Sequence, residues 1–334
     1  MTYSITRRAV LGITAAATMV FAAGVAAAQE KIQLRMSTVA TDSDQRTVAL
    51  AEVFGPGVAA FANYEPHYNG VLFKQATELE AIARGNLEMA IISAQELASF
   101  FPEFSVFTAG YLHRDAAHQV AVFNNALMDP FKKKVEDELG VKLLTVMYLG
   151  RRQLDLRMSR AELDVKTPAD LAGVKLRMPG TDAWQFLGSA LGANPVPVAF
   201  GEIYTSLQTG AIDGQDNPLP TNKDSKFYEV TKQIVMTSHL VDLNYLALSL
   251  DAWNKMTPEQ QAATQKAADD AAALGRERQL KLEDDLVQFF KEQGLEVYTP
   301  DVDAFRTQVQ AAYLASPYAE SWPEGIVEAI NAAN

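Results

Sequence analysis

The chain has 334 residues and a mass of 36.5 kDa, more than one typical hydrophobic core, so we expect two domains. Hydrophobic residues make up 48% and charged residues 21%, a globular composition that excludes a wholly disordered chain. The 41 acidic residues outnumber the 29 basic ones and give a net charge of −12, which argues against nucleic acid or an anionic membrane as the main partner.

Residues 1–28 have the pattern of a cleaved export signal. Arg7 and Arg8 precede an uncharged stretch over residues 9–28, which ends in the small-residue site Ala26-Ala27-Ala28. A membrane anchor is the alternative, but nine of these twenty residues are Ala, two are Gly and two are Thr, so the stretch is weakly hydrophobic. We expect cleavage near Ala28 and a periplasmic mature protein. The paired arginines fit the twin-arginine route, and a Sec signal fits as well.

The chain after residue 28 alternates strand and helix patterns. We predict strands over residues 32–39, 87–94, 141–149 and 174–178, and helices over 45–61, 78–84, 130–139, 181–191 and 200–208. Short strands separated by helices are typical of parallel βαβ units with both faces covered. The sequence therefore predicts an α/β fold.

A long helix is predicted near the C-terminal end. Thr257 is a cap residue, Pro258 stands at the first helical position, and the helical pattern continues to Gln293-Gly294. A continuous helix of about 36 residues would be about 54 Å long, which exceeds the width of one domain. The alternative is two helices that break at Gly275.

Two arginines lie in strand patterns and are candidate ligand-binding residues. Arg152 follows the apolar strand 141–149, and Arg177 lies inside Gly173-Val174-Lys175-Leu176-Arg177-Met178. An arginine at the end of a parallel strand would point into the crevice where open α/β sheets bind ligands, and its planar fork matches a carboxylate. The alternative is an arginine paired with a neighbouring acid. Arg157 falls on the opposite face of the strand from Arg152 and is expected to be structural or solvated.

The segment 211–218 reads as a strand-to-loop transition in which Asn217 could bind a polar ligand. It lacks the spacing of a calcium loop, so Asp213 and Asp216 are expected to be turn and cap residues. Trp184 and Phe200 are either pocket walls or core residues.

Metal and nucleophile chemistry have little support in the sequence. The absence of cysteine excludes disulfides, thiolate metal sites and cysteine nucleophiles. The four histidines, His67, His113, His118 and His239, lack HExxH spacing, and His239 is expected to be structural. We expect no metal, no cofactor and no catalytic residue.

Five ordered blocks resemble the extracytoplasmic solute-binding proteins of TRAP (tripartite ATP-independent periplasmic) transporters. They are Gly150-Arg151-Arg152-Gln153, residues 167–177, residues 192–197, residues 200–204 and residues 207–218. The resemblance implies a two-lobed, type II-like periplasmic binding protein fold with one long helix spanning both lobes. It implies lobe I over residues 29–149 plus about 243–285, and lobe II over 150–242 plus about 286–334.

By the same resemblance, Arg177 pairs with the ligand carboxylate, Arg152 and Asn217 support it, and Phe200 lines the pocket. On the other lobe, Gln75, Ser93 and the loop 41–44 fall where the family places ligand-selecting side chains. Sialic-acid binders tend to carry acids where this chain has Gln75 and Ser93. The seven expected ligand-binding residues are thus Arg177, Arg152, Asn217, Phe200, Trp184, Gln75 and Ser93.

The function implied is capture of a small organic acid and its delivery to the TRAP membrane permease. The protein is expected to be a monomer and not an enzyme. Two alternatives stay open: a periplasmic enzyme that acts on an organic acid, and a sensor subunit that presents ligand to a membrane receptor.

Overall fold

The computed structural model describes residues 30–334, and residues 31–334 form one compact unit. The export signal and cleavage site predicted over residues 1–28 therefore lie outside the described residues. Within residues 30–334, no helix combines the length and the apolar character needed to cross a membrane.

One mixed sheet organises the part of the chain that the structure describes. Its strands lie in the order β2-β1-β3-β8-β4-β7-β5-β6, and β9 also pairs with β8. The strands are β1 (Ile32–Ser37), β2 (Ala62–His67), β3 (Met89–Ser93), β4 (Val141–Leu156), β5 (Lys175–Met178), β6 (Asn194–Pro197), β7 (Gly214–Pro218), β8 (Gln233–Ser249) and β9 (Glu296–Tyr298).

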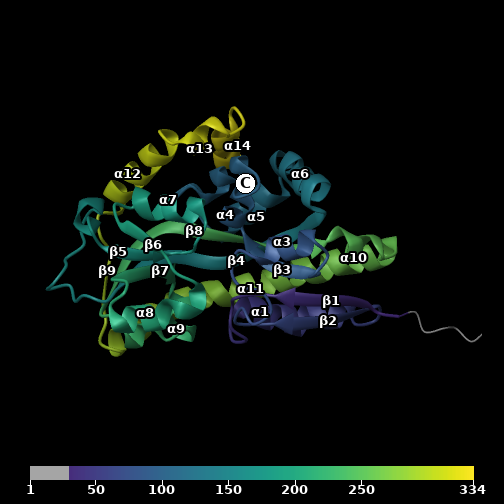
Figure 1. Cartoon of the computed structure of the whole chain (residues 1–334), viewed down its shortest axis with the longest axis horizontal. Coiled ribbons are helices and arrows are strands. Elements are labelled where there is room, and N and C mark those ends of the chain that lie inside the picture. Colours follow the sequence, from purple (N-terminus) through teal and green to yellow (C-terminus); the bar gives the residue numbers. More distant parts are fainter. Residues whose placement is uncertain (1–29) are drawn as a thin grey trace, which may run out of the picture. The chain divides into compact units, whose positions relative to one another are not determined.

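Two long strands, β4 and β8, pair with each other along most of their length and serve both halves of the sheet (Figure 1). Near its C-terminal end β8 pairs with β3, and its first residues pair with β9. The C-terminal part of β4 pairs with β7. A β2-β1-β3 half and a β7-β5-β6 half therefore share β4 and β8, which is the two-lobed α/β architecture expected from the sequence. The lobe boundaries at residues 149/150 and 242/243 stay a prediction.

The sheet contains parallel pairs, as the alternating pattern indicated, but it also contains antiparallel pairs that the sequence did not predict. Strands β3 and β8, β4 and β7, and β4 and β8 pair antiparallel, whereas β1 with β2 and β3, β5 with β6 and β7, and β8 with β9 pair parallel. The predicted strand 141–149 was also too short, since β4 continues to Leu156. The second part of β4 carries Arg152 and Asp155, which are buried because polar partners bond to them. A search for apolar runs does not predict a strand at such residues.

The helices flank the sheet on both faces (Figure 1). The first helical stretch, predicted over 45–61, ends at Val58 and contains one π-helical segment. The α-helices are α1 (Gln45–Ala49), α2 (Gly55–Val58), α3 (Glu78–Ala83), α4 (Ala94–Ala98), α5 (Ala116–Asn124), α6 (Asp129–Leu139), α7 (Asp182–Ala190), α8 (Ile203–Thr209), α9 (Leu219–Asp224), α10 (Leu250–Asn254), α11 (Pro258–Glu292), α12 (Val302–Leu314), α13 (Pro317–Glu320) and α14 (Ile326–Ala332); η1 (Leu50–Phe54) is the π-helical segment, and the 3-10 segments are η2 (Pro102–Thr108), η3 (Ala126–Met128), η4 (Pro168–Leu171), η5 (Phe200–Glu202) and η6 (Phe227–Glu229).

The long helix α11 is continuous over 35 residues, so the alternative of two helices broken at Gly275 was wrong. Thr257 caps it, because its hydroxyl accepts from the Gln260 N–H and the Gln260 side chain accepts from the Thr257 N–H. At Gly275, a Cβ atom would lie 3.2 Å from the Gln45 carbonyl oxygen, so the glycine lets α11 pack closely against α1. The same helix contacts α1 and α2 in one half, and α9 and β9 in the other.

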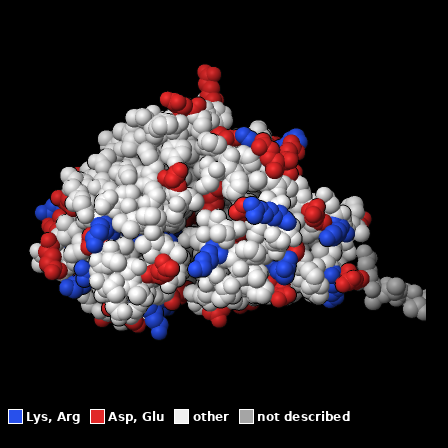
Figure 2. All heavy atoms as spheres, viewed as in Figure 1, with Lys and Arg blue, Asp and Glu red and all other residues white. Residues whose placement is uncertain are grey.

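The C-terminal helices α12–α14 lie along one side of the molecule, above α7 in the view of Figure 1. Helix α12 packs on α7, and α14 packs on η3. The face shown in Figure 2 carries interspersed acidic and basic side chains, with few charges over α7 and α12. Apolar cores lie on both sides of the sheet, one around Leu34, Phe54 and Ala271 and a larger one around Phe104, Trp184 and Phe305.

Candidate ligand-binding site

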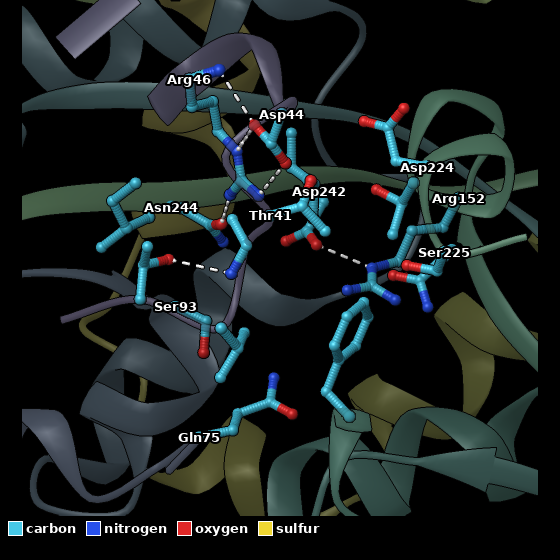
Figure 3. A pocket seen from close by; sticks show the side chains of 18 of the residues that line it. Thr41, Asp44, Arg46, Gln75, Ser93, Arg152, Asp224, Ser225, Asp242 and Asn244 are labelled. Carbon is cyan, nitrogen blue, oxygen red and sulfur yellow. Dashed lines mark hydrogen bonds and ion pairs between the residues drawn. The ribbon is translucent and has the colours of Figure 1, made fainter. Parts of the chain in front are cut away.

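A cavity lies where the two halves of the sheet meet β4 and β8, and Figure 3 shows it from close by. It is lined from the first half by the loop after β1 and by α1, α3, β3 and α4, and from the second by β5, α7, η5, β7 and α9. All seven residues expected at the ligand site line this one cavity: Arg177, Arg152, Asn217, Phe200, Trp184, Gln75 and Ser93. Their role in binding a ligand stays a prediction.

Arg177 is a buried cation without an acidic partner. Its side chain extends from β5, and the residue is 1% exposed. Its Nε donates to the Val198 carbonyl oxygen at 2.8 Å, and its Nη2 donates to Gln75 Oε1 at 3.1 Å across the cavity. Within residues 30–334 it forms no ion pair. Burial lowers the pKa of Arg177 to about 9; the attraction of Asp216 opposes this fall, and the charge of Arg152 adds to it.

Arg152 is buried too, but two aspartates neutralise it. Its Nε donates to Asp242 Oδ2 at 2.7 Å, and its Nη1 lies 3.2 Å from Asp216 Oδ2 and donates to the Asp216 carbonyl oxygen at 2.7 Å. The guanidinium lies over the Trp184 ring. Burial alone would lower the pKa of Arg152, but the two carboxylates outweigh it and the pKa rises. The pairing with a neighbouring acid that the sequence left open therefore holds for Arg152 and not for Arg177.

The expectation that Asp216 is a turn or cap residue was wrong. Asp216 lies within β7, is fully buried, and bonds to both Arg152 and His239. Its pKa is lowered, because the attraction of Arg152 and His239 outweighs the effect of burial. The histidine is structural as expected: its Nδ1 lies 2.7 Å from Thr237 Oγ1.

The other predicted residues differ in how their polar atoms are used. Asn217 lies within β7 rather than in a loop, and its Nδ2 donates to Gln215 Oε1 at 2.5 Å. Ser93 caps α4, and its hydroxyl accepts from the Glu96 N–H. Phe200 is half-buried on the cavity wall, 5.9 Å from the Arg177 guanidinium. Arg157, expected to be structural or solvated, is half-buried and packs against Gly210.

Sequence reasoning missed several charged residues on the cavity wall. Arg46 on α1 pairs with Asp44 at 2.8 Å and donates to Asn244 Oδ1 at 2.5 Å (Figure 3). Asp44 belongs to the loop 41–44 that the resemblance had indicated, and the acids that were missed are Glu78, Glu96, Asp224 and Asp242. One signal was available, since Ser93-Ala94-Gln95-Glu96 is a capping-box sequence that fixes the Glu96 side chain beside Ser93.

Three of these acids have raised pKa values. Burial, and then the repulsion of Glu96, raise the pKa of Glu78 to about 9. Burial raises the pKa of Glu96 to about 7, against the stabilising N–H groups of Ser93 and Ala76. Burial also raises the pKa of Asp224 to about 6. The buried pair Glu78 and Glu96 therefore favours retention of a proton, which makes the pair a hydrogen-bond donor as well as an acceptor.

Comparison with known proteins identifies the family. The model of the bacterial extracellular solute-binding protein family 7 (DctP) matches residues 59–319. The chain belongs to this family. The sialic acid-binding periplasmic protein SiaP of Vibrio cholerae is 29% identical over 235 residues, which are 70% of this chain and 72% of that protein.

Two solved structures of TRAP periplasmic solute-binding proteins from Roseobacter denitrificans are similar in fold. One, with bound 3-deoxy-D-manno-oct-2-ulosonic acid (KDO), is 66% identical with a TM-score of 0.90, over 91% of this chain and 100% of that one. The other, with bound L-galactonate, is 26% identical with a TM-score of 0.81, over 90% of this chain and 98% of that one.

These findings confirm the family, the two-lobed fold and the function expected from the sequence: the protein is a TRAP-type solute-binding protein. They favour this function over the enzyme and sensor alternatives, because the relatives are named as binding proteins.

Proposed function

We propose that this solute-binding protein captures a sugar acid whose carboxylate pairs with Arg177, and that KDO or a close relative of it is the ligand. The observation that carries the proposal is the buried Arg177 guanidinium, which faces the cavity without an acidic partner in residues 30–334. A buried charge without a partner is costly, and an incoming carboxylate removes that cost. The relative with bound KDO, at 66% identity, supports the choice of ligand.

The assignment of roles follows from the contacts. Arg177 already donates through Nε and Nη2, and the ligand carboxylate takes the place of Gln75 or adds to it. Arg152 keeps its two aspartates and holds the wall formed by β4, β7 and β8 in place. Phe200 and Trp184 supply apolar walls against the carbon chain.

Because Gln75 and Arg177 lie on different halves of the sheet, a ligand bound between them holds the two halves together. The protein then delivers the ligand to the TRAP permease as a monomer, without chemical turnover. In this proposal the mature protein is periplasmic and residues 1–28 are removed.

The test is binding of chosen acids to protein that has been unfolded and refolded to remove any retained ligand. We expect KDO to bind in calorimetry and to raise the melting temperature, because a ligand that binds only the native state stabilises it by about 2.7 kcal/mol at a hundredfold excess over Kd. Arg177→Lys should weaken KDO binding at least tenfold, since the ammonium lacks the planar fork.

Three controls make the test decisive. Glucose, a neutral sugar, should not bind, and KDO should be recovered unchanged after prolonged incubation. Light scattering should give the mass of one chain. The proposal fails if no sugar acid binds, or if glucose binds as tightly as KDO.

A further inference from the structure

The acids on the cavity wall suggest how this protein selects its ligand. The cavity is lined by three arginines, Arg46, Arg152 and Arg177, and by five acids, Asp44, Glu78, Glu96, Asp224 and Asp242. Asp44 pairs with Arg46, and Asp242 pairs with Arg152. Within residues 30–334, Glu78, Glu96 and Asp224 form no ion pair, and Arg177 is the cation left over. The wall therefore offers one cation, Arg177, that can pair with a ligand carboxylate, and, among the described residues, no second cation for another carboxylate.

Glu78 is built into this wall rather than solvated. It is the first residue of α3, is 3% exposed, and one of its carboxyl oxygens accepts from the Thr77 N–H at 3.1 Å. Ala76 adopts a left-handed backbone conformation with a φ of 71°, and its N–H supports both Glu78 and Glu96. Such a conformation is uncommon for a residue other than glycine, so the turn holds both carboxyl groups in fixed positions.

The charges that face this pair do not favour ionisation. Glu96 is the charged group that acts on Glu78, and Asp242 acts on Glu96, and both interactions are repulsive. In residues 30–334 none of the three cavity arginines forms an ion pair with either carboxyl group, since Arg46 pairs with Asp44 and Arg152 with Asp216 and Asp242. The pair therefore meets the ligand with a hydrogen-bond donor and an acceptor, in an environment that disfavours further negative charge.

We propose that Glu78, together with Glu96, reads ligand hydroxyl groups and rejects a second carboxylate, which makes the site selective for polyhydroxylated monocarboxylates over dicarboxylates. A hydroxyl group pairs with a carboxyl group in either protonation state, because it both donates and accepts. A second carboxylate would be buried without a cation and could pair only with the protonated form. Glu78 is thus a specificity-determining residue; this inference rests on the proposed carboxylate pairing at Arg177.

The experiment compares ligands in the wild-type protein and in Glu78→Gln. The probes are KDO, L-galactonate and galactarate; galactarate differs from galactonate only by a second carboxylate in place of the terminal hydroxymethyl group. We expect galactarate to bind at least a hundredfold more weakly than the tighter of the two monocarboxylates. In Glu78→Gln this ratio should shrink at least tenfold, with weaker monocarboxylate and stronger galactarate binding, because the neutral amide donates to a carboxylate without a charge of its own.

Glu80→Gln is the matched control, because Glu80 lies on the same helix with its side chain 52% exposed and paired with Arg84. It should leave all affinities unchanged. The inference is overturned if galactarate binds within tenfold of the best monocarboxylate, or if Glu78→Gln leaves the ratio unchanged. Failure of every sugar acid to bind would instead refute the proposed function itself. A loss of fold in Glu78→Gln would show in its melting curve, and Glu78→Asp, which keeps the carboxyl group but withdraws it, should then lower monocarboxylate affinity without admitting galactarate.

Discussion

Replacing Arg177 with methionine should abolish ligand binding and yet stabilise the ligand-free protein. Methionine keeps much of the unbranched side chain and fills irregular apolar space, but it removes a buried charge that forms no ion pair in residues 30–334 and that Asp216 compensates only in part. This outcome separates a functional arginine from a structural one, because removal of a structural arginine destabilises the fold.

The magnitude follows from the environment of Arg177. Burial lowers the pKa of this guanidinium from its ordinary value to about 9. At about 1.4 kcal/mol per unit of pKa, this fall corresponds to a cost of about 5 kcal/mol for holding the charge in the cavity. The substitution also removes the hydrogen bonds to Val198 and Gln75, together about 3 kcal/mol. The net gain in the free energy of unfolding is therefore about 2 kcal/mol, or a few degrees in melting temperature.

Arg152→Met is the matched control, and it should act in the opposite direction. It leaves Asp216 and Asp242 buried without their cation, which costs about 3–5 kcal/mol. The assay is urea unfolding of both variants and of the wild type, after refolding to remove ligand, followed by titration with KDO. The reasoning is refuted if Arg177→Met unfolds more readily than the wild type, or if Arg152→Met is the more stable of the two variants.

Three further predictions concern other parts of the molecule. Gly150→Ala should lower the free energy of unfolding by about 2–3 kcal/mol, because the residue has a φ of 135° and a Cβ atom would lie 2.6 Å from Pro218. Gly85→Ala is the control: with a φ of 73° and open space around it, it should lower the same free energy by only about 1 kcal/mol. The ligand-free protein should lose stability as the pH rises from about 5 to 9, because the fold raises the pKa of Glu78 to about 9 and so keeps a proton that the unfolded chain has released. In Glu78→Gln the free energy of unfolding, measured by melting at each pH, should fall less steeply over this range, by up to about 1.4 kcal/mol per pH unit. Asn217→Ala should weaken KDO binding in calorimetry by less than substitution of Arg177 does, because Asn217 is neutral and already bonded to Gln215 on its own strand. An equal or larger loss of affinity would assign the main ligand contact to Asn217.

The sequence predicted the second half of the site better than the first. Arg177, Asn217 and Phe200 lie in one continuous series of motifs, so one family resemblance placed all of them. The strand patterns alone did not separate Arg177 from Arg152, and only the family resemblance gave the two arginines different roles. Their difference comes from Asp216 and Asp242, which lie 64 and 90 residues after Arg152 and meet it only when β7 and β8 flank β4.

The acids of the first half escaped prediction for a local reason. Glu78 stands at the start of a short helix, where an acid is ordinarily solvated and stabilised by the helix dipole. Glu78 is nevertheless 3% exposed, because it lies on the wall of the cavity, and an amphipathic pattern does not encode that tertiary placement. The directions of β4 and β8 were missed for a similar reason, since an apolar run indicates a buried strand but not the direction in which its neighbours run.

The ligand-free cavity holds groups that compensate one another poorly, and this couples recognition to closure. The Arg177 guanidinium has no ion-pair partner in residues 30–334, and Glu78 and Glu96 are buried side by side without a cation to pair with. In the proposed complex a sugar acid offsets both costs, because its carboxylate would pair with Arg177 while its hydroxyl groups would bond to Glu78 and Glu96. A ligand shifts a conformational equilibrium only by its difference in affinity for the two states. A carboxylate without hydroxyl groups would pair with Arg177 but leave Glu78 and Glu96 without ligand partners, so we expect it to favour closure less than a sugar acid does.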